Sequence, residues 1–338
     1  MLWAAFGLAG AALAQNPAAP AVAGAAVASD ARSVGDWLMR MHDASRQRTY
    51  VGTFVVSSGS GSLSSSRIWH ACDGTQQMER VESLTGTPRS TFRRNDHVVT
   101  FLPESRLART EKRESLGMFP GLLKASETSI PEFYSAQVIG AERVAGFDAD
   151  IVQLAPRDNL RFGYRIWSEK KTGLVVKLQT LDGEGQVLEQ AAFSELQLDA
   201  PVKMDKLAQL MANTEGYTVQ KVDPVKTSAE AEGWVLRNPV AGFRPVTCYK
   251  RPMAPQAPGE GTVQWIFSDG LASVSLFVEA YDRRRHPKEV MLSMGATQTL
   301  TRRLGDKGEK GGDWWLTAVG EVPPQTLKAF AQSLERRK

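Results

Sequence analysis

Residues 162–193 carry the most regular alternation of apolar and polar positions in the chain. Tyr164 and Ile166 fall on one face of an extended segment, because side chains alternate between the two faces of a strand. Turn sequences with glycine, at 171–173 and 182–185, interrupt the alternation. Glycine accepts the positive φ that tight turns need. The pattern therefore predicts three antiparallel strands joined by two tight turns.

Shorter alternating runs before this segment predict more strands of the same sheet. These runs cover residues 50–57, 63–71, 76–84, 89–94, 97–102, 134–143 and 147–154. An amphipathic helix is expected to precede them, since Val34, Trp37 and Met41 recur at helical spacing. Ser33 and Asp36 have the spacing of a capping box at the start of that helix. We expect the helix to cover one face of the sheet.

An apolar cluster at residues 116–123 interrupts the series of strands. It contains Gly117, Pro120 and Gly121, which oppose a long stable helix. Two interpretations remain open at this point. The segment is either a piece of the core or a movable lid over an apolar cavity, because elements of low local stability often gate binding sites.

A helical stretch at 201–216 separates this first part from a second one. Asp269-Gly270 lies between two alternating apolar runs, which is a strong signal for a β-hairpin. A final helix is expected to begin at Pro323-Pro324 and to bury Leu327 and Phe330. The second part, residues 217–338, is therefore predicted to be a small antiparallel sheet packed against one helix.

The start of the chain reads as an export signal. Residues 1–14 form an apolar run that ends in small residues, as a secretory signal peptide does, and residues 15–29 read as a flexible Ala/Pro leader. Residues 30–200 are then the first domain. We therefore expect the protein to be exported.

The net charge of +4 is unevenly distributed. Residues 217–338 carry 18 Lys and Arg against 13 Asp and Glu, whereas residues 30–216 carry 23 against 24. The second domain is therefore expected to meet an anionic partner. Basic residues are not interleaved with aromatic residues in a stripe, which argues against nucleic acid.

Catalytic and metal-binding motifs are missing from the sequence. The four histidines, at positions 42, 70, 97 and 286, stand at no helical ligand spacing, and His70-x-Cys72 offers only two soft ligands where structural zinc wants four. No nucleophile elbow, zinc-protease helix or phosphate-binding loop occurs. We therefore expect neither an enzyme nor a metal or other cofactor.

Two cysteines, Cys72 and Cys248, are the only ones in the chain. An oxidising compartment would allow them to pair and to tie the two domains together. The alternative is a pair of separate thiols buried in strands. Sequence alone does not decide between the two.

Several segments resemble known families. The meander at 162–193 resembles the later half of the LolA-like lipoprotein-carrier half-barrel, a curved antiparallel sheet closed by helices over an apolar cavity. With FSDGLASVSLFVEA at 267–280 and GEVPPQTLKAFAQSL at 320–334, the whole mature chain resembles the MucB/RseB family of periplasmic negative regulators of sigma-E. The resemblance implies an α+β fold, with a LolA-like half-barrel followed by a smaller sheet and helix.

The resemblance also implies a function without catalysis. Such a protein binds the periplasmic part of a RseA/MucA-like transmembrane anti-sigma factor, shields it from proteolysis, and is released by lipid, lipopolysaccharide or lipoprotein signals. Lipid-cavity candidates are Phe54, Trp69, Phe101, Met118, Phe119, Leu122, Leu123 and Trp167. Partner-binding candidates are Trp265, Phe267, Asp269, Arg283, Arg284 and Arg285.

Other functions stay open at this level. A lipid or lipoprotein carrier of the LolA type would use the same first domain and would not need the second. A periplasmic hydrolase would need converging acid, base or nucleophile side chains. Assembly into a homo-oligomer also stays open.

Overall fold

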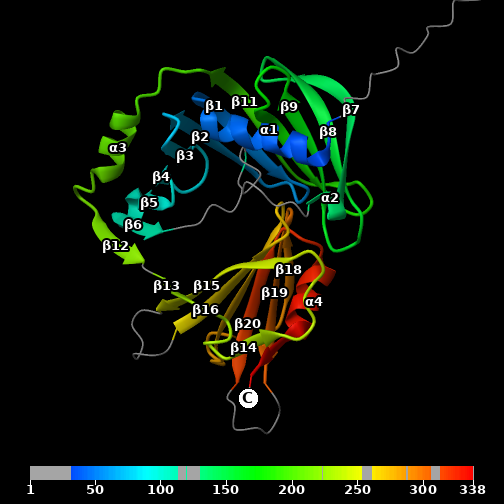
Figure 1. Ribbon diagram of the computed structural model, residues 1–338. Coiled ribbons are helices and arrows are strands. Elements are labelled where there is room, and N and C mark those ends of the chain that lie inside the picture. Colours follow the sequence, from blue (N-terminus) through cyan, green and yellow to red (C-terminus); the bar gives the residue numbers. More distant parts are fainter. Residues whose placement is uncertain are drawn as a thin grey trace, which may run out of the picture.

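The computed structural model describes residues 32–112, 119, 130–222, 224–252, 261–286, 288–305 and 313–337. Two large sheets organise these residues into two domains, which lie one below the other in Figure 1. The first sheet has twelve strands and the second has seven. The predicted α+β class, with a large curved antiparallel sheet followed by a smaller sheet and a helix, is confirmed.

The first domain begins with a helix and continues as an antiparallel meander. Its elements are α1 (Val34–Gln47), β1 (Tyr50–Ser58), β2 (Leu63–Cys72), β3 (Gln77–Ser83), β4 (Ser90–Arg94), β5 (His97–Leu102), the short 3₁₀ helix η1 (Pro103–Ser105), β6 (Leu107–Lys112), α2 (Ile130–Phe133), β7 (Tyr134–Val144), β8 (Phe147–Pro156), β9 (Gly163–Glu169), β10 (Val175–Leu181), β11 (Val187–Leu198), α3 (Met204–Ala212) and β12 (Thr218–Val222). The strand order is β12-β6-β5-β4-β3-β2-β1-β11-β10-β9-β8-β7. Strands β9, β10 and β11 are the predicted meander, with the expected turns between them.

Helix α1 lies across one face of the sheet (Figure 1). Ser33 caps it as predicted, since its hydroxyl accepts from the amide of Asp36 and the Asp36 carboxylate accepts from the amide of Ser33. The apolar stripe of α1 buries Trp37 and Met41 to 1% exposure against strands β8, β9 and β10. Burial of this stripe fixes the helix on the sheet.

Helix α3 packs on the opposite face of the same sheet. Its Leu207 and Met211 join Met78, Phe92 and Phe101 in a separate core cluster. Ile68 of β2 packs toward α1 and pairs with Val81 of β3. Because side chains alternate along each strand, Met78 of β3 and Phe92 of β4 point to the opposite face, away from α1. The sheet thus carries helices on both faces, α1 and the short α2 on one and α3 on the other.

The second domain is an antiparallel sheet packed against one helix. Its elements are β13 (Val225–Thr227), β14 (Trp234–Leu236), β15 (Arg244–Pro252), β16 (Gly261–Ser268), β17 (Ser273–Ala280), β18 (Met291–Met294), β19 (Thr297–Leu304), β20 (Trp314–Gly320), α4 (Pro324–Ser333) and β21 (Leu334–Arg336). Leu327 and Phe330 of α4 have no exposed surface, and the ring of Phe330 lies 4.9 Å from that of Phe267. The predicted helix and the hairpin at Asp269-Gly270 are both present.

Strand pairing divides the chain slightly later than the sequence suggested. The predicted helical linker at 201–216 contains α3, but β12 beyond it pairs with β6 and completes the first sheet. This is a parallel pairing in an otherwise antiparallel sheet. The second sheet begins after it, at β13. Among the described residues, no helix combines the length and apolar character needed to cross a membrane. The predicted signal peptide and leader lie outside the described residues.

Candidate functional site

Three phenylalanine rings form an aromatic cluster on the face of the first sheet that carries α1. The ring of Phe119 lies 5.5 Å from that of Phe54 and 5.1 Å from that of Phe193. Phe54 and Phe193 face each other across β1 and β11, and their rings are 6.2 Å apart. Phe119 is far from both of these residues in the sequence, and its ring packs on the rings of Phe54 and Phe193. Two of the predicted cavity residues, Phe54 and Phe119, are thus brought together.

The other described cavity candidates lie on the opposite face. Phe101 belongs to the core under α3. Trp69 faces Arg80 across β2 and β3. Trp167 alternates with Ile166, which packs toward α1, and its indole donates to Glu142 at 2.6 Å. The predicted cavity residues therefore lie on two faces of the sheet, because the strand register decides which face each ring takes. Met118, Leu122 and Leu123 lie outside the described residues.

An ion pair between Arg161 and Asp269 joins the two domains. Arg161 precedes β9 in the first domain, and Asp269 lies in the turn between β16 and β17 in the second. The Arg161 guanidinium donates to Asp269 Oδ2 at 2.7 Å, and neither side chain has any exposed surface. The hydroxyl of Tyr134 donates to the same oxygen at 3.3 Å. Asp269, predicted as a partner-binding residue, is instead buried between the domains.

The remaining polar atoms of this pair are also satisfied. Asp269 Oδ1 accepts from the amides of Leu271 and Ala272 at 2.9 and 2.7 Å, which fixes the hairpin turn. Arg161 donates to the carbonyl of Ala241 at 2.6 Å and to the Asp158 carboxylate. Burial raises the pKa of the Asp269 carboxyl, and the hydrogen bonds from the two amides and from Arg161 act in the opposite direction. A buried charge is tolerated only with such complete pairing.

Aromatic rings enclose the Arg161 guanidinium. It lies 4.2 Å from the ring centre of Phe133 in the first domain and 4.9 Å from that of Phe243 in the second. Gly242 lies against it with φ of +79°, and a Cβ at that position would come within 2.7 Å of the Phe133 ring and would also collide with Arg161. Only glycine fits there. The domains therefore meet around one buried cation.

Each domain also inserts an apolar side chain into the other. Leu271 from the second domain packs against the α1 core of the first. Leu160 from the first packs against the core of the second, and its carbonyl accepts from Thr326 Oγ1 of α4 at 2.8 Å. This exchange makes the domain junction part of both cores. We call the junction formed by Arg161, Asp269, Tyr134, Leu160 and Leu271 the domain latch.

A second contact between the domains lies at the turn between β18 and β19. Gly295 in this turn is close to Ser58 and Glu189 of the first domain, so that a Cβ on it would lie 2.5 Å from Glu189 Oε2. Burial raises the pKa of the Glu189 carboxyl, and a hydrogen bond from the Ala296 amide partly offsets the rise. This turn thus adds a further contact between the two domains, apart from the domain latch.

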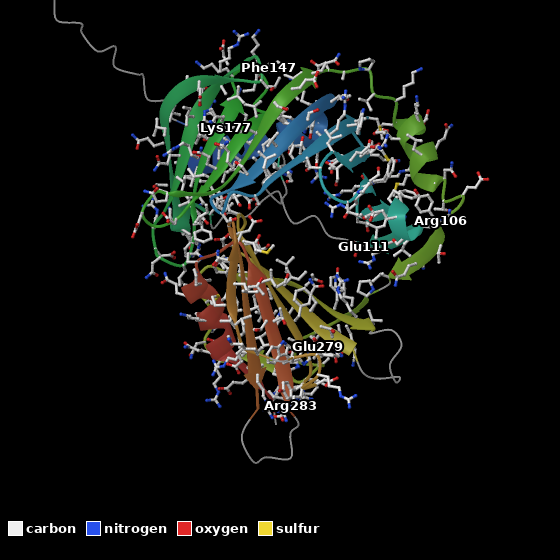
Figure 2. All side chains as sticks on the ribbon, turned by 180° about the vertical axis from the view of Figure 1, so that it is seen from behind. Arg106, Glu111, Phe147, Lys177, Glu279 and Arg283 are labelled. Atoms are coloured by element: carbon white, nitrogen blue, oxygen red, sulfur yellow. The ribbon has the colours of Figure 1, made fainter. Side chains whose placement is uncertain are left out.

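The predicted partner-binding residues of the second domain separate into buried and exposed groups. Phe267 is 2% exposed and belongs to the core under α4, and Trp265 is half-buried beside it. Arg283, Arg284 and Arg285 lie exposed at the end of the domain that points away from the first domain, as Arg283 shows in Figure 2. Arg285 donates to Glu279 at 2.6 Å. The basic tip and the domain latch lie at opposite ends of the β16–β17 hairpin.

Histidines and cysteines form no site of their own in the described part of the chain. His70 is 2% exposed, donates from Nδ1 to the Arg48 carbonyl at 2.7 Å and stacks on Tyr50. Burial lowers the pKa of His70 to about 4. Among the described residues, no three histidine, cysteine or carboxylate side chains converge as metal ligands would. Cys72 lies in the first sheet and Cys248 in the second, and both are free thiols, as in the alternative without a disulfide.

Sequence reasoning missed Arg161 and Phe193. Arg161 stands beside an ordinary turn and pairs with Asp269, 108 positions away, and nothing in its local sequence marks this. Phe193 stands in a predicted strand and lies on the same face of it as Ala191, two positions earlier. The sequence did not show which strand would pair with it.

Comparison with known proteins assigns both domains to one family. Residues 33–211 match the model of the MucB/RseB N-terminal domain, and residues 228–335 match that of the MucB/RseB C-terminal domain. The sigma factor AlgU regulatory protein MucB of Pseudomonas aeruginosa is 30% identical over 91% of this chain and 92% of its own length. The sigma-E factor regulatory protein RseB of Escherichia coli K12 is 24% identical over 91% of this chain and 92% of its own length.

Solved structures agree with this assignment. MucB in complex with MucA(peri) superimposes with a TM-score of 0.67 at 25% identity and covers 90% of this chain and 98% of its own. The MucA/MucB complex of Pseudomonas aeruginosa superimposes with a TM-score of 0.68 at 25% identity, covering 90% and 99%. Since both domain models match in order and together span most of the chain, the protein belongs to the MucB/RseB family.

Proposed function

We propose that this protein is a periplasmic regulator of the envelope stress response. It binds the periplasmic part of a transmembrane anti-sigma factor, shields that part from proteolysis, and releases it when a lipid signal arrives. The observation that carries the proposal is the match of both domains, in order, to a family whose solved relatives include MucB bound to MucA(peri). A lipid carrier would need the first domain alone, whereas here the domain latch builds the second domain into the core of the first.

The basic tip of the second domain supports an electrostatic contact with the partner. Arg283 and Arg284 are exposed there, in the part of the chain that carries the positive excess. Exposed charges of this kind raise the association rate and set orientation more than they add affinity. The proposed contact does not include Asp269 and Phe267, because both side chains are buried.

The aromatic cluster supports a lipid trigger in the first domain. The ring of Phe119 occupies the space above Phe54 and Phe193, so an acyl chain entering there must displace it. A near-complete population switch needs a differential affinity of about 5.5 kcal/mol. Since each buried methylene contributes about 0.8 kcal/mol, roughly seven methylenes suffice. Part of one acyl chain therefore supplies the energy without any headgroup contact.

Binding of the immobilised periplasmic region of the anti-sigma factor tests the partner contact. We expect the variant Arg283→Glu/Arg284→Glu to associate about tenfold more slowly at low salt, because steering depends on these charges. The matched variant Arg89→Glu/Arg109→Glu reverses two exposed charges of the first domain and is expected to bind normally. Equal loss in both variants would place the contact elsewhere, and absence of binding by the unaltered protein would reject the regulator function.

Phe119→Ala tests the lipid trigger. Removal of this ring opens room for an acyl chain, so lipid should release the anti-sigma region at a lower concentration than from the unaltered protein. Phe147 has a half-buried ring at the turn between β7 and β8 (Figure 2). Phe147→Ala should leave the release concentration unchanged. Neutral acyl lipids that enter the domain but never release the partner would contradict the mechanism.

A further inference from the structure

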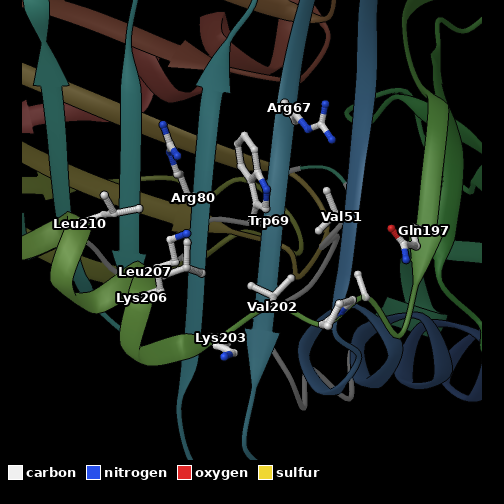
Figure 3. A pocket seen from close by; sticks show the side chains of 12 residues that line it. Val51, Arg67, Trp69, Arg80, Gln197, Val202, Lys203, Lys206, Leu207 and Leu210 are labelled. Atoms are coloured by element: carbon white, nitrogen blue, oxygen red, sulfur yellow. The ribbon is translucent and has the colours of Figure 1, made fainter.

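A pocket of about 610 Å³ lies between α3 and strands β1 to β3 (Figure 3). It opens on the face of the first sheet that α3 covers, opposite the aromatic cluster of Phe54, Phe119 and Phe193. Trp69 stands on its sheet side and Leu207 on its helix side. Its volume falls in the range of small-molecule sites, about 300–1,000 Å³.

The described residues that line the pocket combine apolar and cationic side chains, and none of them is a carboxylate. Seven of the twelve lining residues are apolar, Trp69, Val202 and Leu207 among them, and four are cations. The cations are Arg67, Arg80, Lys203 and Lys206. The twelfth is Gln197. Contiguous accessible apolar surface with a polar rim is typical of ligand-binding grooves, and clefts lined by one sign of charge concentrate ligands of the opposite sign.

Two of the four cations, both arginines, lie over one aromatic ring. The guanidinium of Arg80 lies 4.8 Å from the ring centre of Trp69, and that of Arg67 lies 5.4 Å from it. Arg80 is held in place by Glu82 at 2.9 Å and by the hydroxyl of Ser90 at 3.2 Å. Arg67 is exposed. Figure 3 shows these two arginines on the strands and the two lysines across the pocket, at and after the start of α3.

We propose that this pocket binds a single-chain amphiphile with an anionic headgroup. The chain lies on Trp69, Val202 and Leu207, and the headgroup is held among the four cations. Arginine matches phosphate and carboxylate oxygens with paired donors, and phosphate has the most oxygens to offer. A cationic or neutral amphiphile of the same chain length gains only the binding free energy of burying its chain, since its headgroup makes no ion pairs with the four cations. The assignment goes beyond the proposed function, since it places a second ligand site away from the aromatic cluster and needs no anti-sigma partner.

Titration calorimetry of the full chain with monomeric dodecyl phosphate tests the site. Dodecyl maltoside and dodecyltrimethylammonium are the neutral and cationic probes of equal chain length, and inorganic phosphate is the headgroup alone. We expect dodecyl phosphate to bind at least tenfold more tightly than the other three, because charge-assisted hydrogen bonds and chain burial act together. Binding should change the fluorescence of the unaltered protein, and Trp69→Phe should remove that change.

Two charge variants locate the headgroup. Lys203→Gln/Lys206→Gln removes two cations of the pocket and should weaken dodecyl phosphate binding about tenfold. Lys226→Gln/Lys328→Gln removes two exposed cations of the second domain and should leave it unchanged. Equal affinity for the neutral probe, equal affinity for phosphate alone, or equal loss in both lysine variants would each overturn the assignment. None of these results depends on whether the anti-sigma factor is bound.

Discussion

Replacing Asp269 by asparagine removes one charge from the domain latch and little else. Asparagine has the same shape, and its carbonyl oxygen can still accept from the amides of Leu271 and Ala272. The hairpin turn should therefore survive. Arg161 cannot lose its charge, and it remains buried with no anionic partner in the second domain.

The magnitude follows from the burial of the pair. Both side chains have 0% exposure, and removing one partner of a buried ion pair costs about 3–5 kcal/mol. An exposed pair provides the matched comparison. Arg303 and Asp313 also pair, with side chains 48% and 42% exposed, and such pairs contribute about 0–1 kcal/mol. Asp269→Asn should thus be destabilising by several kcal/mol relative to Asp313→Asn.

Urea unfolding followed by circular dichroism and tryptophan fluorescence measures the difference. Because each domain buries a side chain of the other, we expect the unaltered protein to unfold in one transition. In Asp269→Asn the transition should move to lower urea, and the two probes should separate as the domains uncouple. In the double variant Arg161→Met/Asp269→Asn, part of the stability should return, because the buried cation is gone. Asp158, the other partner of Arg161, is 29% exposed and can be solvated by water. If Asp269→Asn and Asp313→Asn differed by less than about 1 kcal/mol, the latch would not hold the domains together.

Three further results are expected. Folding lowers the pKa of His70 to about 4, so as the pH falls the unfolded chain takes up the proton before the folded protein does, and stability is lost below about pH 6.5. Measured by urea unfolding, the loss of stability between pH 7 and pH 5 should be about 2 kcal/mol larger in the unaltered protein than in His70→Asn. Equal losses in the two proteins would contradict this. Gly146 has a similar positive φ to Gly242 but open space around it. Gly242→Ala should therefore lower the free energy of unfolding by at least about 2 kcal/mol more than Gly146→Ala does, and equal losses would exclude the clash. Burial raises the pKa of Cys248 to about 11, so iodoacetamide should modify it far more slowly than the half-buried Cys72 under native conditions, as peptide mass mapping can show, and neither should be found in a disulfide.

Local signals in the sequence decided the elements of this protein. The capping box at Ser33, the Asp269-Gly270 turn and the alternation around Tyr164 each depend on residues a few positions apart, so the chain carries them without reference to the rest of the fold. The family resemblance rested on the same segments. For this reason the strands, the helices and the two-part organisation were predictable.

Tertiary structure alone decided which side chains meet. Phe54 and Trp69 are both alternating strand residues, yet they lie on opposite faces. The register between β1 and β2 pairs Phe54 with Ser66 and Trp69 with Val51, and this pairing sets the face that each ring takes. Arg161 and Asp269 meet only after both domains have folded. Local sequence fixes what depends on neighbours along the chain, whereas the faces, the pocket and the latch depend on contacts between residues far apart in it.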